Sequence, residues 1–147
     1  MTRFQFPLQR VMEWRALQVR SEEEKLTGMQ QQHEALVLRE KALTAAELNS
    51  EMGLLKMPTI DGNDLQALSQ FQARIHTERR NLQVRRKHFE AQIVEQRKHL
   101  LKARRDHRVL EKLKETRWRT WTYLNDREIE TIAAEAYMSK WIREMAP

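Results

Sequence analysis

Five histidines are the side chains of this sequence best suited to metal binding or to proton transfer near neutral pH. They are His33, His76, His88, His99 and His107. No two of them form the H-E-x-x-H pattern of a helical zinc site. Glu95 and His99 have the spacing of an ordinary surface pair on a helix. Because Cys is also absent, the sequence offers no thiolate ligand, no Cys nucleophile and no disulfide, and we expect no metal site.

Phosphate-binding loops are not expected either, because the chain has 3 Gly among 147 residues. We find no P-loop, no dinucleotide-binding fingerprint and no nucleophile elbow. The sequence therefore predicts a protein without enzymatic activity and without a cofactor. We expect its function to depend on binding partners.

The composition favours long helices over a compact domain of many elements. One third of the residues are charged, and only 3 Gly and 3 Pro are available for turns. Three of these six breakers fall within GLLKMPTIDGND at 53–64, where Asp61 and Asp64 resemble a helix N-cap with an acidic first turn. Pro7 suits the first turn of a helix. We expect one domain over 1–147, with a helix at about 7–55, a turn at 56–61 and a helix at about 62–143.

A seven-residue apolar repeat runs through both expected helices, and we call its positions the seam. Such a repeat predicts a left-handed coiled coil, and one short turn makes the two helices antiparallel neighbours. The expected fold is thus all-α, an antiparallel two-helix coiled-coil hairpin with a longer second helix. The seam positions run in steps of seven from Leu8 to Met57 and Met12 to Leu54, then from Leu68 to Leu124 and Gln72 to Trp121.

The unequal lengths of the helices predict an overhang. Folding back about residue 58 places Pro7 opposite a residue near 109, so that the chain beyond about 110 extends past its partner. Large exposed apolar patches mark interaction sites, and Trp and Tyr are enriched in them. Self-association, or folding back onto the hairpin, is the alternative. The overhang contains Trp118, Trp121, Tyr123, Leu124, Ile129, Ile132, Tyr137 and Trp141.

The net charge of +6 is unevenly distributed. Residues 71–120 carry 16 Lys and Arg against 6 Asp and Glu, a net of +10. This block favours an acidic partner surface, nucleic acid or anionic lipid, unless it is simply a solvated helix face. We expect no specific nucleic-acid binding, because its basic clusters are scattered and no recognised motif accompanies them. No apolar run approaches the roughly 18 residues of a membrane span, and we see no signal peptide.

Two ends of the sequence resemble one known family. The start FQFPLQRVMEWR at 4–15 is similar to the opening of the flagellar FliJ family, an aromatic–x–Phe–Pro–Leu–x–x–Val–Leu pattern. VLEKLKETR at 109–117 resembles that family's Leu-Glu-Lys-Leu-Lys block. REIETIAAEAY at 127–137 resembles its C-terminal segment, although Glu130 stands at the usual Lys position and Ala133 and Ala134 replace an acidic pair.

The resemblance implies a stalk-like component of the flagellar type III protein export apparatus. Members of that family are antiparallel coiled coils similar to the central stalk of rotary ATPases. They bind the hexameric export ATPase and promote its assembly, and they contact the membrane export gate and export chaperones. A cytoplasmic protein associated peripherally with the inner membrane at the flagellar base is therefore expected, as a monomer or with weak self-association.

The candidate partner-binding residues form two groups. The first would contact the ATPase, with closure of the hairpin end as the alternative role. The second would contact the export gate, although Ile75 and Leu82 also occupy the seam and core packing is the better explanation for them. The ATPase group is Phe4, Phe6, Pro7, Leu8, Val11, Leu110, Leu113, Trp118, Trp121 and Tyr123, and the gate group is Phe71, Ile75 and Leu82.

Other functions remain open at this point. Related stalk proteins of virulence type III secretion share the expected architecture. A basic coiled-coil scaffold that forms a stable dimer, or a nucleic-acid-binding protein whose affinity falls steeply with salt, would also fit the composition.

Overall fold

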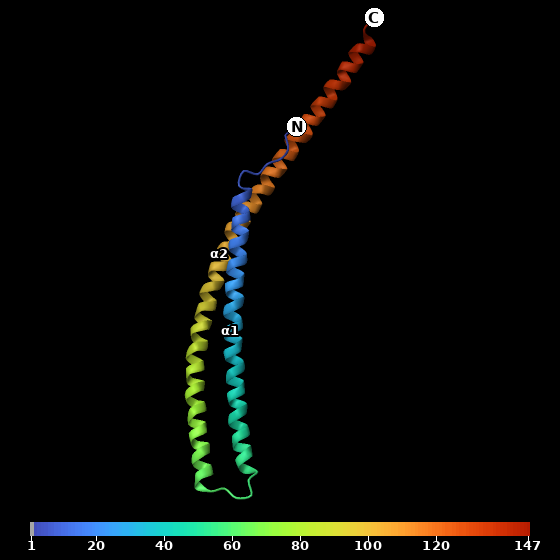
Figure 1. Cartoon of the computed structure of the whole chain (residues 1–147). Helices are drawn as coiled ribbons and strands as arrows, with labels where there is room; N and C mark the ends of the chain where they lie inside the picture. Colours follow the sequence, from blue (N-terminus) through green and yellow to red (C-terminus); the bar gives the residue numbers. More distant parts are fainter. Residues whose placement is uncertain (1) are drawn as a thin grey trace. The chain divides into compact units, whose positions relative to one another are not determined.

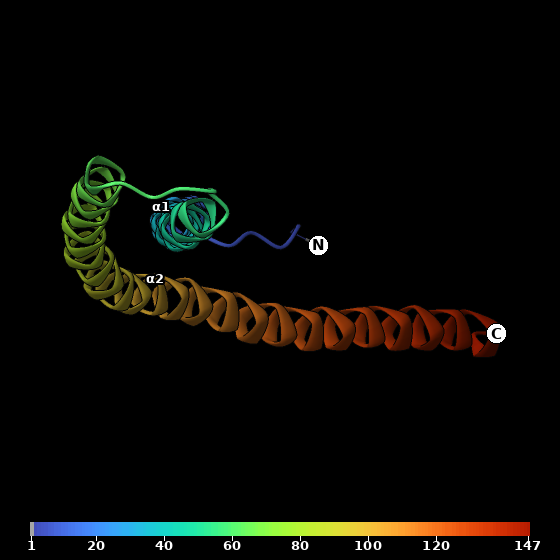
Figure 2. The same ribbon diagram turned by 90° about the horizontal axis from the view of Figure 1, so that it is seen from below.

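The computed structural model describes residues 2–147 as two helices. Helix α1 spans Gln9–Leu55 and helix α2 spans Gly62–Met145. The two helices lie side by side and run in opposite directions (Figure 1). Residues 56–61 cross from the end of α1 to the start of α2 (Figure 2). The predicted all-α hairpin with a longer second helix is therefore confirmed.

Helix α1 begins at Gln9, two residues later than expected. The first i to i+4 bond of the helix runs from the Met12 N–H to the Leu8 carbonyl, at 2.9 Å. Before it, the Gln9 N–H donates to the Phe6 carbonyl at 3.1 Å, so Pro7 and Leu8 form a turn. The missing N–H of Pro7 is tolerated in this turn as well as in a first helical turn, which is why the sequence did not separate the two positions.

Helix α2 begins where the sequence predicts, and a reciprocal cap explains its start. The Asp64 N–H donates to Asp61 Oδ1 at 2.9 Å, and the Asp61 N–H donates to Asp64 Oδ2 at 3.2 Å. Two backbone donors that the helix itself cannot satisfy are thus bonded. The far end of α2 lies at Met145, two residues beyond the expected end.

The hairpin comprises two compact units. We call Arg20–Leu101 the loop unit, and Met1–Val19 with Lys102–Pro147 the terminal unit. The core of the loop unit consists of Leu36, Leu43, Ile75 and Leu82, with Ala46, Phe71 and Phe89 packed against it. All four buried residues are seam positions, so the heptad pattern predicted the buried face correctly.

Polar pairs across the seam fix the register of the loop unit. Arg86 Nη1 donates to Glu40 Oε2 at 2.7 Å, and Arg79 Nη2 donates to Glu47 Oε2 at 2.8 Å. Polar groups at coiled-coil core positions select register at a cost in stability. These pairs therefore explain how an imperfect apolar seam specifies one alignment of the helices.

The register differs from the predicted one. The Gln72 side-chain amide donates to Glu51 Oε1 at 2.8 Å. Four residues of α1 lie between Glu51 and the loop, whereas ten residues of α2 lie between the loop and Gln72. Because the first turns of α2 extend past the end of α1, the fold-back point lies later than residue 58. In the terminal unit, Lys114 Nζ accordingly donates to Gln9 Oε1 at 2.8 Å, and Pro7 does not lie opposite residue 109.

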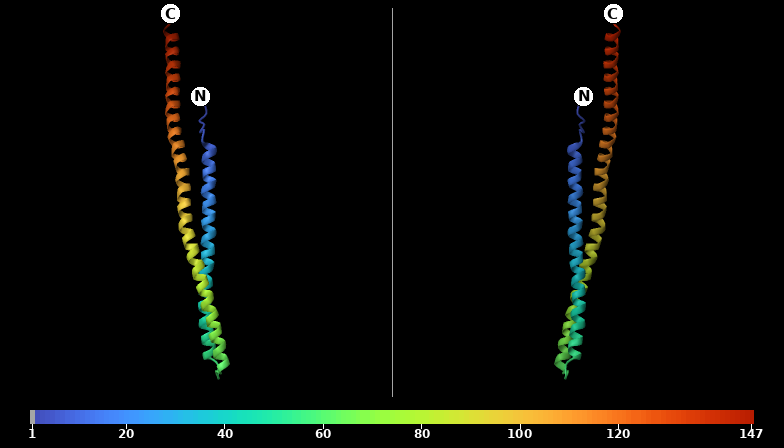
Figure 3. Two further views of the ribbon diagram at one scale, coloured as in Figure 1. Left: turned by 90° about the vertical axis from the view of Figure 1, so that its left-hand side faces the viewer. Right: turned by 90° about the vertical axis from the view of Figure 1, so that its right-hand side faces the viewer.

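The uncovered part of α2 is shorter than expected. Half-buried side chains continue along α2 as far as Asn125, and every residue from Asp126 to Pro147 is exposed. The reason is that the extended segment before α1 covers a part of α2 that α1 does not reach. Figure 3 shows the final turns of α2 continuing past that segment. From here on, the overhang means residues 126–147, the part of α2 that the structure leaves uncovered.

Candidate functional site

Three aromatic rings from the two ends of the chain form one cluster in the terminal unit. The centroid of Phe4 lies 5.1 Å from that of Trp118 in an edge-on arrangement and 5.9 Å from that of Trp121. The two Trp rings stack at 5.2 Å. Such pairs each contribute about 0.5–1.5 kcal/mol beyond the burial of their area. We call Phe4, Trp118 and Trp121 the aromatic cluster.

Phe6 anchors the extended segment beside this cluster. Its side chain is 8% exposed, and the Arg117 guanidinium lies over its ring at 6.0 Å. Pro7 restricts the backbone next to Phe6 because its ring fixes φ, and the Gln9 N–H donates to the Phe6 carbonyl to close the turn into α1. The cluster therefore closes the end of the hairpin, while Trp118 stays 48% exposed and available to a partner.

The remaining residues of the predicted ATPase group divide into two sets. Leu8, Leu110 and Leu113 are half-buried along the junction of the helices, next to the cluster. Val11 and Tyr123 are exposed. Arg127 lies over the Tyr123 ring at 5.8 Å. The structure thus brings together most of the group, including residues from 4–8 and from 110–121.

An open groove of about 580 Å³ lies beside the aromatic cluster. Its apolar wall consists of Phe4, Met12 and Trp118, and its charged rim carries Glu111, Lys114 and Glu115. Sequence reasoning placed Met12 in the seam and did not assign it to a site. The seven-residue spacing of Glu111 and Trp118 puts them on one side of a helix and was the available signal.

The predicted gate group is mostly core. Ile75 is 3% exposed and Leu82 is 6% exposed, as their seam positions predict. Phe71 packs against this core but is half-buried and keeps part of its ring at the surface. A partner could reach Phe71 without opening the hairpin, whereas Ile75 and Leu82 would first have to be uncovered.

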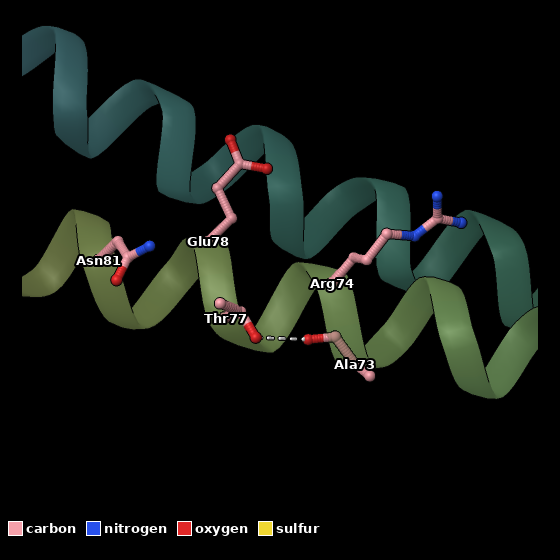
Figure 4. A pocket seen from close by; sticks show the side chains of 5 residues that line it. All are labelled: Ala73, Arg74, Thr77, Glu78 and Asn81. Atoms are coloured by element: carbon pink, nitrogen blue, oxygen red, sulfur yellow. Dashed lines mark hydrogen bonds between the residues drawn. The ribbon is translucent and has the colours of Figure 1, made fainter.

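A shallow hollow on α2 near these residues offers no chemistry. Its five lining residues all lie on α2 (Figure 4), and the Thr77 hydroxyl donates to the Ala73 carbonyl at 3.1 Å. Glu78 is already paired with Arg39, at 2.8 Å. The hollow is therefore a shallow part of the side of α2 in which Glu78 is already engaged.

Several titratable side chains form small ion-pair networks across the helices, such as Glu40, Arg86 and Glu90, and Glu47 with His76 and Arg79. Within residues 2–147, no group of three or more His, Asp or Glu side chains could hold a metal ion. His33 Nε2 lies 3.1 Å from Glu90 Oε1 across the helices. A hydrogen bond from the Gln96 side chain lowers the pKa of Glu22, against a smaller opposing effect of burial, and Lys25 adds to the lowering.

The overhang is apolar on more than one side. At 100° per residue, Ile129 and Ile132 share a face with Trp118, and Trp141 and Met145 occupy the opposite face. All are exposed, as are Tyr137, Met138 and Ile142. Eight of its 22 residues are charged, so every side of the helix is mixed, and its exposed apolar side chains are what a partner would cover.

Comparisons of the chain with models of known protein families, with curated proteins and with solved structures find no match. The resemblance therefore rests on the residues of the opening block and of the 109–117 block, and on their placement in the hairpin.

Proposed function

We propose that this protein is a non-enzymatic, stalk-like component of the bacterial flagellar type III protein export apparatus. In this role the terminal unit binds the hexameric export ATPase and promotes its assembly and activity. Contacts with the export gate and with export chaperones belong to the same proposal, with Phe71 as the accessible residue of the gate group. The protein would act in the cytoplasm, peripherally at the inner membrane of the flagellar base.

One observation carries the proposal. The two blocks that resemble the FliJ family lie about a hundred residues apart in the sequence, yet they form a single surface. Gln9 from the first block is bonded to Lys114 from the second, and Phe6 lies under Arg117. The antiparallel hairpin brings these two stretches together, so the residues that carry the resemblance lie on one surface that a single partner can contact.

The overhang supports a partner that encloses it. Its apolar side chains occupy several faces of one helix, so a single groove would cover some and leave the others in water. A ring-shaped partner can contact all faces at once. No helix among residues 2–147 is long and apolar enough to cross a membrane, so a bilayer does not supply that enclosure in the manner of a spanning helix.

The test measures the steady-state rate of ATP hydrolysis by the cognate flagellar export ATPase, with and without this protein. The ATPase is kept below the concentration at which it assembles. Stimulation together with hexamer formation is the expected result. A Trp118→Ala/Trp121→Ala variant should lose at least about tenfold in affinity for the ATPase, since buried Trp residues dominate interfaces. The control is Trp14→Ala, because Trp14 on α1 is about as exposed as Trp118 and belongs to neither the aromatic cluster nor the groove beside it.

Three outcomes would overturn part or all of the proposal. If the wild-type chain neither bound nor stimulated the ATPase, the stalk-like function would be wrong. If the chain stimulated the ATPase but the double variant did so equally well, the aromatic cluster would be a structural closure of the hairpin and the contact would lie elsewhere. Stimulation of a virulence-system ATPase, with none of the flagellar enzyme, would reassign the secretion system.

A further inference from the structure

A second heptad-spaced row of residues runs along α2 in the terminal unit. Its members alternate at three- and four-residue steps and are all exposed. The row lies on the side of α2 away from Ala103, which is buried against α1. We call this row the basic stripe. It consists of Lys102, Arg105, Val109, Lys112, Thr116 and Arg119.

The charge of the basic stripe is largely uncompensated. Arg119 is paired with Glu115. In the part of the chain that the structure describes, Lys102, Arg105 and Lys112 have neither an ion pair nor a side-chain hydrogen bond. The neighbouring carboxylates are engaged elsewhere, with Asp106 bonded to Arg15 at 3.2 Å and Glu111 beside His107 at 3.6 Å. Like charges one helical turn apart repel, so an external partner would relieve a cost that the free protein carries.

The composition and exposure of the stripe indicate the kind of partner. Steps of three and four residues lie along one side of any α-helix, so the stripe is a continuous face along which a second helix can lie. Val109, which is 64% exposed, stands in the middle of the cations. The Thr116 hydroxyl is bonded to the Lys112 carbonyl at 2.9 Å, which leaves its methyl group for an apolar contact. Phosphate binding requires neither an apolar centre nor heptad spacing, and the stripe has no aromatic residue on which a base could stack.

We propose that the basic stripe binds an acidic amphipathic helix of a partner protein, which lies along α2 as a third helix. Carboxylates of that helix would pair with Lys102, Arg105 and Lys112, and an apolar residue would cover Val109. The site is separate from the aromatic cluster and from the overhang, so this inference goes beyond the proposed function and does not depend on it.

The test uses a synthetic, labelled helical peptide of about three heptads, with Glu at alternating three- and four-residue steps and one central Leu. A second peptide has the same composition and helicity but Glu at other spacings. Fluorescence anisotropy would measure the affinity of both for the full-length protein at roughly physiological ionic strength, where distant charges are screened. The heptad-spaced peptide is expected to bind at least about tenfold more tightly than the other.

The charge-reversal variant is Lys102→Glu/Arg105→Glu/Lys112→Glu, and the matched control is Arg74→Glu/Arg80→Glu/Arg85→Glu, which changes the net charge equally at exposed positions of the loop unit. The first should lose at least about tenfold in affinity and the second less than about threefold. Circular dichroism would confirm that both remain helical. Equal affinity for the two peptides, equal loss in both variants, or tighter binding of duplex DNA or phosphatidylserine vesicles through the same residues would overturn the proposal.

Discussion

Individual polar residues decide how the two helices of this hairpin align. Gln96 occupies a seam position where an apolar residue is expected, and it is 6% exposed. Its side-chain amide donates to the Glu22 carbonyl at 3.1 Å and also to the Glu22 carboxylate. Leaving a buried amide without such partners would destabilise the fold by about 1–3 kcal/mol. A shift of the helices by one residue would break these bonds, so the pair acts against register slippage.

This pair predicts a pH-dependent contribution to stability. The bond from Gln96 lowers the pKa of Glu22 below its ordinary value of 4.5. A carboxyl group with a lowered pKa in the folded state stabilises the protein above its unfolded pKa, and that contribution is lost as the pH falls through the folded pKa. In Gln96→Leu the pKa of Glu22 should rise, as measured by NMR titration of its side chain.

Glu13 provides the internal reference for that titration, because it lies on the same helix but is not bonded to Gln96. An unchanged Glu22 pKa in Gln96→Leu would show that Lys25, and not Gln96, is responsible for the lowering.

At the scale of the elements, helix α1 contains two glycine residues whose small size no neighbouring atom requires. Gly28 and Gly53 lie within α1, and a methyl group added at either would meet nothing within 4 Å. Glycine inside a helix is less stable than Ala because its unfolded backbone has more freedom to lose. Neither residue serves a turn here, since α1 continues through both.

Gly28→Ala should therefore stabilise the protein by about 1 kcal/mol. Urea unfolding followed by circular dichroism would measure the change in the free energy of unfolding. Gly62→Ala is the matched control, because Gly62 is the first residue of α2 and gains less from helix propensity. A destabilised Gly28→Ala protein would mean that close packing of a partner helix, and not chance, keeps this position small.

The cap of α2 gives a prediction of the opposite sign. Asp61→Ala removes the oxygen that accepts the Asp64 N–H and should cost about 1 kcal/mol. Asp61→Asn retains an acceptor and should cost less, which separates the cap from the charge. Equal losses in the two variants, measured by the same urea unfolding, would contradict the capping explanation.

The sequence predicted the elements better than their ends. Leu36, Leu43, Ile75 and Leu82 recur at heptad spacing, and burial follows that spacing directly. The start of α2 was also predictable, because a cap is a local signal. The register was not, since it depends on pairs such as Gln72 with Glu51, which lie on different helices and leave no trace in either periodicity.

The residues of the candidate site were predicted, but their arrangement in space was not. Trp118 and Trp121 were identifiable as residues without a helical partner, and Phe4 as an apolar residue ahead of the first helix. That the extended segment would run alongside α2 and shorten the overhang could not be read from helical patterns. Packing of Phe6 against α2 decides it, through a contact between residues more than a hundred positions apart.

On the scale of the whole molecule, the buried core and the proposed contact surfaces lie mostly in different parts of the chain, with Phe71 of the proposed gate group as the exception. The loop unit holds the apolar core and most of the ion pairs between helices. The terminal unit holds the aromatic cluster, the basic stripe and the overhang. A molecule built in this way can change its binding surfaces without unfolding its core, which is what a component with several partners requires.

Truncation after Asn125 tests this division. All residues of the overhang are exposed, so its removal should change the free energy of unfolding, measured in urea, by no more than about 0.5 kcal/mol. The helical circular dichroism signal should fall with the number of residues removed. Phe6→Ala, by contrast, empties a buried site and should cost roughly 2–4 kcal/mol in the stability of the terminal unit. If the truncated chain unfolded much more readily, the overhang would have to pack against the hairpin or a second copy in solution, and its apolar faces would not be free for an enclosing partner.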